Sequence, residues 1–214
     1  MFGLDDDVRA AQAHLTADSY LAGIVDRQQG LRVIGGWDRF EVAVRVIVGQ
    51  QISVVGATTI TARIVERHGR SLPGSVLGLT HLFPTPDALI GLQAEGLGMP
   101  GSRVATIRAL AAAVLDGTLD LRADPAIVRE RLLTLPGVGP WTAEVIMMRA
   151  VRDPDAFPAS DLGIRHAIAA VLGRAEPPPV DEVESLGETW RPYRALAAQH
   201  LWSSLRTISA KENS

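Results

Sequence analysis

The sequence predicts an all-α protein, and three observations support this class. Apolar residues recur at helical spacing along nearly the whole chain, as in Phe40, Val44 and Ile47. Nowhere do apolar and polar residues alternate over the length of a strand. Several positions carry the signature of a helix start, for example Asp124 followed by Pro125.

The predicted elements follow from that spacing and from further start signals at Gly139 with Pro140 and at Ser160 with Asp161. About ten helices are expected, near residues 6–16, 18–29, 38–49, 53–68, 86–93, 102–116, 124–134, 140–151, 161–173 and 189–207, with a short turn near 181–186. Breaks rich in proline and glycine lie at 71–86, 96–102, 152–160 and 174–179. The break at 152–160 is the predicted hinge between two helical lobes, 36–155 and 1–35 plus 156–214.

Composition places the chain among globular proteins. It has 214 residues, of which 47% are hydrophobic, enough to bury a core. No apolar run is long enough for a membrane span, and the first ten residues carry acids where a signal peptide would carry basic residues. These features predict a cytoplasmic protein that does not associate with a membrane.

The absence of cysteine limits the chemistry. Without cysteine there is no disulfide, no thiol nucleophile, no zinc-thiolate site and no cysteine-held iron-sulfur cluster. The five histidines are too far apart in sequence to form a local ligand pair. We therefore expect no required cofactor. The net charge of −3 argues against a protein that simply coats nucleic acid, although a small local binding surface is compatible with it.

The segment "LPGVGPW" places a tight turn between two predicted helices, within residues 124–151. Gly137 and Gly139 let the main chain approach a bulky anion closely, and their amides lie at the positive end of the helix that starts at Pro140. This arrangement predicts a phosphate site at Gly137, Val138, Gly139 and Thr142. The alternative is a proline-glycine connection that only reverses the chain.

The full pattern resembles a helix-hairpin-helix motif, in which main chain grips a DNA phosphate without reading sequence. The motif also occurs in ligases, polymerases and junction-binding proteins, so alone it indicates binding and not chemistry. The resemblance implies a structural Na⁺ or K⁺ held by the carbonyls of Leu133, Leu135 and Val138.

A carboxylate follows at Asp161, where a loop containing proline opens the next predicted helix. An aspartate here could simply cap that helix. Together with the hairpin, however, it resembles the signature of the helix-hairpin-helix (HhH-GPD) DNA glycosylase superfamily, whose aspartate at this position is catalytic. Asp155, earlier in the loop, is the alternative carboxylate.

Five blocks between about residues 31 and 203 are similar to 3-methyladenine DNA glycosylase II of the AlkA type: "FEVAVRVIVGQQISVVGATTITARIV", "FPTPDAL", "LGMPGSRVATIRALAAAVLDGTLDL", "LPGVGPWTAEVIMMRA" and "WRPYRALAAQHLW". The resemblance implies a two-lobed helical fold with the active site in the cleft between the lobes. Members often carry an N-terminal β domain, which we do not expect in this chain, so it is a short member or part of a longer or fused protein.

The implied reaction is hydrolysis of the N-glycosidic bond of an alkylated base in duplex DNA. A carboxylate stabilises the oxocarbenium character of the sugar and orients the attacking water. Members that also cut the strand use a lysine at the position of Trp141, and the only lysine in the chain is Lys211. We therefore expect a monofunctional glycosylase that leaves an abasic site, in a monomeric bacterial protein associated with the nucleoid when it acts.

The base pocket and the wedge are further implications of the resemblance. An aromatic pocket would favour a cationic base, and the matching positions are Trp141 and Trp202, with Tyr193 as a third contact or a packing residue. A further aromatic of the family is replaced here by Val145. The minor-groove wedge falls on Gln51, with Gln50 beside it, where the family often has leucine.

Two alternatives differ from this hypothesis. One is a glycosylase of the same superfamily that acts on other damaged or mismatched bases. The other is a DNA-binding module without catalysis, which would have no use for a carboxylate that faces the negatively charged DNA. The role of Asp161 separates the last alternative from the other two.

Overall fold

The computed structural model describes residues 8–212, with the side chains of residues 75, 76 and 206–212 left aside. The chain divides into two compact units. Unit 1 combines residues 1–35 with 147–214, and unit 2 comprises residues 36–146. The second boundary thus lies at Ile146–Met147, earlier than the expected 155–156. The first two residues of the helix expected at 6–16, and the side chain of Lys211, lie outside the described part.

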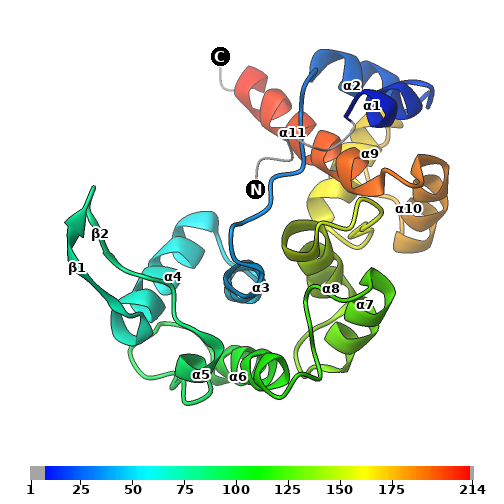
Figure 1. Cartoon of the computed structure of the whole chain (residues 1–214). Coiled ribbons are helices and arrows are strands. Elements are labelled where there is room, and N and C mark those ends of the chain that lie inside the picture. Colours follow the sequence, from blue (N-terminus) through cyan, green and yellow to red (C-terminus); the bar gives the residue numbers. More distant parts are fainter. Residues whose placement is uncertain (1–7, 213–214) are drawn as a thin grey trace. The chain divides into compact units, whose positions relative to one another are not determined.

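Unit 2 is a helical assembly with one small hairpin (Figure 1). Its elements are α3 (Arg39–Val48), α4 (Val54–His68), β1 (Ser71–Val76), β2 (Leu79–His81), α5 (Pro86–Leu89), α6 (Gly101–Leu115), α7 (Pro125–Thr134) and α8 (Pro140–Ile146). Helix α3 packs against α4, α6 and α8, and α7 packs against α8. The apolar face of α3 includes the fully buried Ile47 and Val48 and forms the centre of this unit.

Unit 1 is formed by two segments that are far apart in the sequence. Its elements are α1 (Val8–Thr16), α2 (Ala22–Arg27), the π-helix η1 (Met147–Val151), α9 (Leu162–Val171), α10 (Val180–Gly187), the 3₁₀ turn η2 (Glu188–Trp190) and α11 (Arg194–Glu212). Helix α11 packs against α9 and α2. Leu15, Leu21, Trp190 and Leu201 are among the fully buried side chains of this unit.

The predicted all-α class and most helix starts are confirmed. Helices α7 and α8 begin at Pro125 and Pro140, and Asp161 caps α9. Within residues 8–212, no helix combines the length and hydrophobicity that crossing a bilayer requires.

The structure differs from the prediction where side chains or tertiary contacts override spacing. The break at 71–86 contains the antiparallel hairpin β1–β2, too short and irregular to show as an alternating pattern. The helix expected at 18–29 covers only Ala22–Arg27, because the side chain of Asp18 accepts the N–H groups of Tyr20 and Leu21 in a local turn.

Two helices expected as single elements are divided. The segment at 140–151 changes to π-helical geometry at Met147. The helix expected at 189–207 is preceded by a 3₁₀ turn and starts only at Arg194, because Pro192 lacks the N–H that a helix needs. A full helix, α10, occupies the place of the turn expected at 181–186.

Candidate functional site

The turn between α7 and α8 is built around Gly137. Its φ of +78° lies in the left-handed region, which residues with a β-carbon rarely adopt. A β-carbon here would also lie 2.0 Å from Oγ1 of Thr106 in α6. The turn therefore packs against α6 so closely that only glycine fits at position 137.

Steric contacts do not explain the glycine at position 139, since nothing lies within 4 Å of the β-carbon that another residue would carry there. The residue is exposed, and its carbonyl accepts the N–H of Ala143 at 2.9 Å, at the start of α8. The packing of unit 2 does not require glycine here. The open space lies at the N-terminal end of a helix, where an anion is favoured.

Val138 and Thr142 are buried residues of the α7–α8 hairpin, which consists of these two helices and the turn between them. The Val138 side chain is buried, and its N–H donates to the carbonyl of Leu135 at 3.1 Å. This amide is therefore used within the turn. Thr142 is also buried, and its hydroxyl accepts a hydrogen bond from Nε2 of Gln50 at 2.8 Å.

Gln50 and Gln51 follow the end of α3 but have different environments. The amide of Gln50 is directed to the hairpin, where it donates to Thr142 and, at 3.1 Å, to the carbonyl of Gly137. Gln51 is exposed, and its φ of +55° is left-handed, a sparsely populated region for a residue with a β-carbon. Of the two residues expected at the wedge, Gln51 is the one with an exposed side chain.

In unit 1, Asp161 is brought together with Trp202. Oδ1 of Asp161 accepts the backbone N–H of Ile164 at 3.0 Å, which caps α9. The same oxygen accepts Nε1 of Trp202, on α11, at 2.8 Å. Asp161 is half-buried. The aspartate is thus a helix cap, as the alternative interpretation required, and it is also held by an aromatic side chain from a second helix.

Two residues that the sequence did not single out complete this pair. The guanidinium of Arg149 lies over the ring of Trp202, 5.5 Å from its centroid, and donates to the carbonyl of Ile34 and to Oε1 of Gln199. Gly163 lies beneath the pair, since a β-carbon there would be 3.0 Å from Oδ1 of Asp161. Trp202 is distant in sequence from both residues, so helical spacing gave no signal for its contacts with them.

Each of the other two aromatic candidates has its own surroundings. Trp141 belongs to unit 2 and is partly exposed on α8. Tyr193 belongs to unit 1, where its ring meets that of His14 at 5.6 Å, edge to face. It also lines a cavity of about 250 Å³ together with Met148, Arg152 and Leu196, and neither Asp161 nor Trp202 is among the lining residues.

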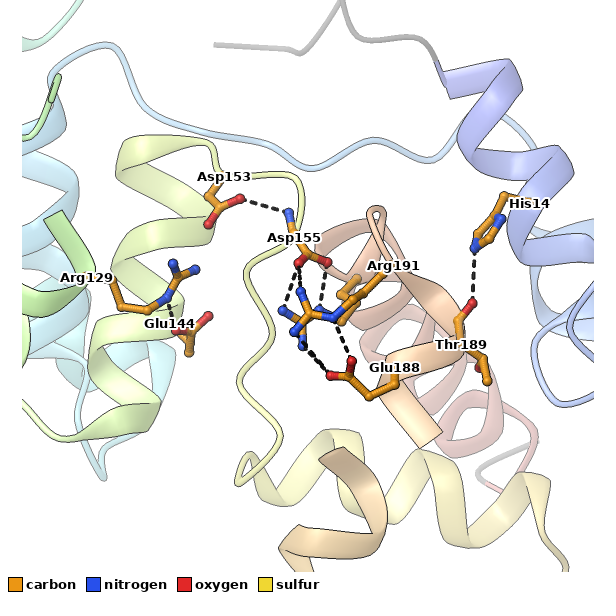
Figure 2. A network of polar contacts seen from close by, with 9 residues as sticks. His14, Arg129, Glu144, Asp153, Asp155, Glu188, Thr189 and Arg191 are labelled. Atoms are coloured by element: carbon orange, nitrogen blue, oxygen red, sulfur yellow. Dashed lines mark hydrogen bonds and ion pairs between the residues drawn. The ribbon is translucent and has the colours of Figure 1, made fainter. Parts of the chain in front are cut away.

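Asp155, the alternative carboxylate, is part of an ion-pair network (Figure 2). Its two oxygens accept Nε and Nη2 of Arg194 at 2.7 and 2.9 Å, and Arg191 donates to it as well. Glu188 pairs with the same two arginines. Since both oxygens of Asp155 are engaged by guanidinium groups, this carboxylate serves to hold the loop before α9 against the start of α11.

Among the described side chains, no group of three or more histidines, aspartates and glutamates is arranged to hold a metal ion. Asp161 is held in unit 1 by two hydrogen bonds. The contacts with Ile164 and Trp202 fix its orientation through neutral N–H donors.

Comparison with known proteins gives consistent results. A family model described as "HhH-GPD superfamily base excision DNA repair protein" matches residues 44–192. A relative from Mycobacterium tuberculosis, "Probable bifunctional transcriptional activator/DNA repair enzyme AlkA", is 43% identical over 207 residues, which are 96% of this chain and 41% of that protein. "DNA-3-methyladenine glycosylase 2" of Escherichia coli is 33% identical over 178 residues, 81% of this chain and 60% of that protein.

A solved structure supports the same grouping. The "3-methyladenine dna-glycosylase from Archaeoglobus fulgidus" is 26% identical to this chain with a TM-score of 0.79, covering 94% of this chain and 70% of that one. The chain spans less than two thirds of the length of the two curated relatives described above. The similarity thus covers nearly all of this chain but only part of those proteins.

Proposed function

Because the chain belongs to the HhH-GPD superfamily of base excision DNA repair proteins, we propose that it acts as a DNA glycosylase. The proposed reaction is hydrolysis of the N-glycosidic bond of an alkylated base in duplex DNA, which leaves an abasic site. The names of the relatives from Escherichia coli and Archaeoglobus fulgidus support alkylated bases as substrates. The observation that carries the proposal is the carboxylate of Asp161, held by Ile164 and Trp202.

The proposed mechanism uses the charge of Asp161. As the bond to the base breaks, positive charge develops on the deoxyribose, and a carboxylate fixed beside the sugar stabilises it. The same carboxylate orients the water that attacks the sugar carbon. A base that is already cationic after alkylation leaves without a second carboxyl group as proton donor. One acid is therefore enough for this substrate class.

The base has to leave the duplex before this chemistry. We propose that Trp202 forms an aromatic wall for the extruded base, which favours a cationic ring. Since Arg149 already covers one face of the indole, the base would use the other face. The assignments of Trp141 to the pocket and of Gln51 to the wedge stay predictions. Tyr193 is better explained as a packing residue against His14.

The hairpin is the proposed phosphate anchor, with Gly139 at its open side. A monovalent cation on the carbonyls of Leu133, Leu135 and Val138 is compatible with the turn, because the Leu135 carbonyl accepts one hydrogen bond and retains a second lone pair. Bound there, the ion would neutralise the carbonyl dipoles close to the phosphate. No step of the proposed reaction depends on it.

Strand cleavage is not part of the proposed activity. The position that carries the lysine nucleophile in the cutting members of the superfamily is Trp141, and an indole cannot form a Schiff base. The only lysine of the chain is Lys211. Product analysis tests this point, since an abasic strand stays intact until it is heated in alkali.

The test of the proposed function is a set of duplexes that each carry one defined lesion: 3-methyladenine, 7-methylguanine, hypoxanthine or 8-oxoguanine. We expect release of the free methylated bases, measured by chromatography, with strand breaks only after alkali treatment. Preferential release of 8-oxoguanine would favour the alternative glycosylase. Tight duplex binding without release of any base would favour a binding module.

Alanine substitution of the two hairpin glycines separates DNA contact from folding. Gly139→Ala should leave thermal stability unchanged, because its β-carbon meets nothing, yet weaken duplex binding about tenfold by holding the phosphate away from the amides. Gly137→Ala should instead lower the melting temperature, because of the contact with Thr106 and the left-handed backbone. Calorimetry and fluorescence anisotropy measure both. Equal duplex affinity of Gly139→Ala and wild type would contradict the phosphate role.

A further inference from the structure

We infer that Gln50 is a positioning residue that couples the loop carrying Gln51 to the hairpin. This inference rests on the proposed function, because it takes Gln51 as the side chain that enters the DNA stack and the hairpin as the phosphate anchor. Both parts belong to unit 2, so their relation is fixed within one compact body. Their residues are separated by about ninety positions in the sequence, and Gln50 bridges them.

The bridge consists of two hydrogen bonds from one amide group. Nε2 of Gln50 donates to the carbonyl of Gly137 at 3.1 Å and to Oγ1 of Thr142 at 2.8 Å. These acceptors lie on either side of the exposed Gly139. A single side chain thus holds both ends of the turn that would receive the phosphate.

Helix α6 supports the loop and the turn together. Nη2 of Arg103 donates to the backbone carbonyl of Gln50 at 2.6 Å. One turn further along α6, Thr106 is the residue that packs against Gly137 so closely that no β-carbon fits. Residues three apart lie on the same face of a helix. One face of α6 therefore fixes the main chain of the loop and the main chain of the hairpin.

The backbone at Gln51 makes this support necessary. Its left-handed φ of +55° is sparsely populated for a residue with a β-carbon, and such a conformation persists only where the neighbouring residues hold it. On one side the loop is held through Gln50. On the other side Ser53 caps α4 by accepting the N–H of Gly56 at 3.1 Å. Gln51 stands exposed between these two fixed points.

The exposed surface next to Gln51 is apolar. Val54 and Val55, in the first turn of α4, are 84% and 76% exposed. Apolar side chains beside a wedge suit the floor of a minor groove and unstacked bases. The coupling by Gln50 would set how far this loop stands from the phosphate held at Gly139. A loop that enters DNA gains from such fixed spacing, because small displacements in an assembled site have large effects on rate.

Gln50 itself is not the wedge, since its amide is already used inside the protein. The sequence "GQQIS" contains two adjacent glutamines of similar chemistry, and the structure assigns them different tasks. Gln50 holds the loop after α3 against the turn between α7 and α8. Gln51 is the exposed residue of this loop. The two roles predict different results when each is replaced.

The test uses Gln50→Leu, which keeps the size of the side chain and removes both hydrogen bonds. The duplex carries 2-aminopurine at the target position, so that fluorescence reports extrusion of the base independently of bond hydrolysis, and anisotropy reports binding. We expect the affinity for undamaged duplex to stay within about threefold, while the extrusion equilibrium falls about tenfold, as expected from two hydrogen bonds. Thr142→Val, which removes one acceptor, should give a smaller loss.

The matched control is Gln93→Leu, an exposed glutamine of the same unit whose amide bonds only locally to the carbonyl of Gly91. It should change neither signal. In the Gln50→Leu/Thr142→Val double variant the losses should not add, because both remove the same contact.

Each result decides the inference. Parallel loss of binding and extrusion in Gln50→Leu, or no loss of extrusion, would overturn it. If Gln50→Leu does not unfold cooperatively, Thr142→Val alone decides by the same criterion. A wild type that extrudes 2-aminopurine but releases no alkylated base would contradict the proposed reaction and leave the coupling standing. A wild type without any extrusion signal would overturn the coupling.

Discussion

Asp161→Asn is expected to lower the rate of alkylated-base release by about a thousandfold, the range found when a charged catalytic group is removed. The substitution removes the negative charge and keeps the size of the side chain. Asparagine caps helices as well as aspartate does, and its side-chain oxygen can still accept from Ile164 and Trp202. The measurement is single-turnover release of 3-methyladenine with enzyme in excess over the duplex.

Stability should change little in this variant, because the contacts of Oδ1 at 3.0 and 2.8 Å can be retained by an amide oxygen. Asp38→Asn is the matched control. Asp38 is also a helix cap, whose side chain accepts the N–H of Glu41 at 2.8 Å, but it precedes α3 in unit 2. This control should release base at the wild-type rate and unfold at a similar temperature.

A rate for Asp161→Asn within a few fold of wild type would disprove the proposed mechanism whatever the substrate. Asp155 would not account for such residual activity, since its oxygens are engaged by Arg191 and Arg194. Duplex affinity should hardly fall in Asp161→Asn, because a carboxylate repels the DNA backbone. Loss of turnover with retained binding is thus the expected pattern for a catalytic charge.

Most of the helices could be predicted from the sequence, because their signals are local. Caps such as Asp124 and Asp161 and the proline at position 140 act within one turn of the residues that they organise. The structure places helix starts at these positions. The β1–β2 hairpin and the π-helical turn at Met147 were missed, because strand pairing over a few residues and a one-residue change of helical register leave no periodic signal.

The candidate site was only partly predictable. Resemblance singled out Asp161 and Trp202 separately, and the hydrogen bond between them joins residues 41 positions apart. Arg149 could not be found in this way, because its position depends on the packing of Trp202, Ile34 and Gln199 around it.

The different roles of Gln50 and Gln51 could not be predicted from the sequence either. Pattern alone placed it beside Gln51 as part of one wedge, and only the contacts with Gly137 and Thr142 distinguish the two residues. Local sequence therefore indicates which residue types are present, while tertiary contacts decide which of two neighbours is directed inward.

The second large effect is expected in the pH dependence of stability, and it depends on His200. This residue of α11 is fully buried, and burial lowers its pKa from 6.5 to about 4. When the nitrogen of the Gln28 amide faces the ring, it donates to Nδ1 at 3.0 Å and to the His200 carbonyl at 3.3 Å. In the neutral ring Nδ1 is then the acceptor and Nε2 carries the proton, and among the described residues Nε2 has no hydrogen-bond partner. A second proton, on Nδ1, would face the N–H group of Gln28. The neutral form of the ring is therefore favoured.

The sign of the effect follows from proton uptake. The unfolded chain takes up a proton on His200 below pH 6.5, while the folded protein does so only near pH 4. Between these pH values the unfolded state binds more protons than the folded state. The contribution of neutral His200 to the free energy of unfolding is therefore fully present above pH 6.5 and is lost as the pH decreases towards 4. The loss amounts to about 3 kcal/mol, at about 1.4 kcal/mol for each pKa unit.

Urea unfolding at pH 7.5 and pH 5 measures the part of this loss that falls between the two pH values, about 2 kcal/mol. His200→Leu should show a smaller decrease in the free energy of unfolding between the two pH values than wild type, because the titrating group is gone. His166→Gln is the control, since His166 is exposed on α9 and should leave the wild-type difference unchanged. Equal pH dependence in His200→Leu and wild type would contradict the prediction. If His200→Leu does not fold, an NMR titration of the wild-type imidazole decides, because protonation near pH 6.5 would exclude a buried neutral ring.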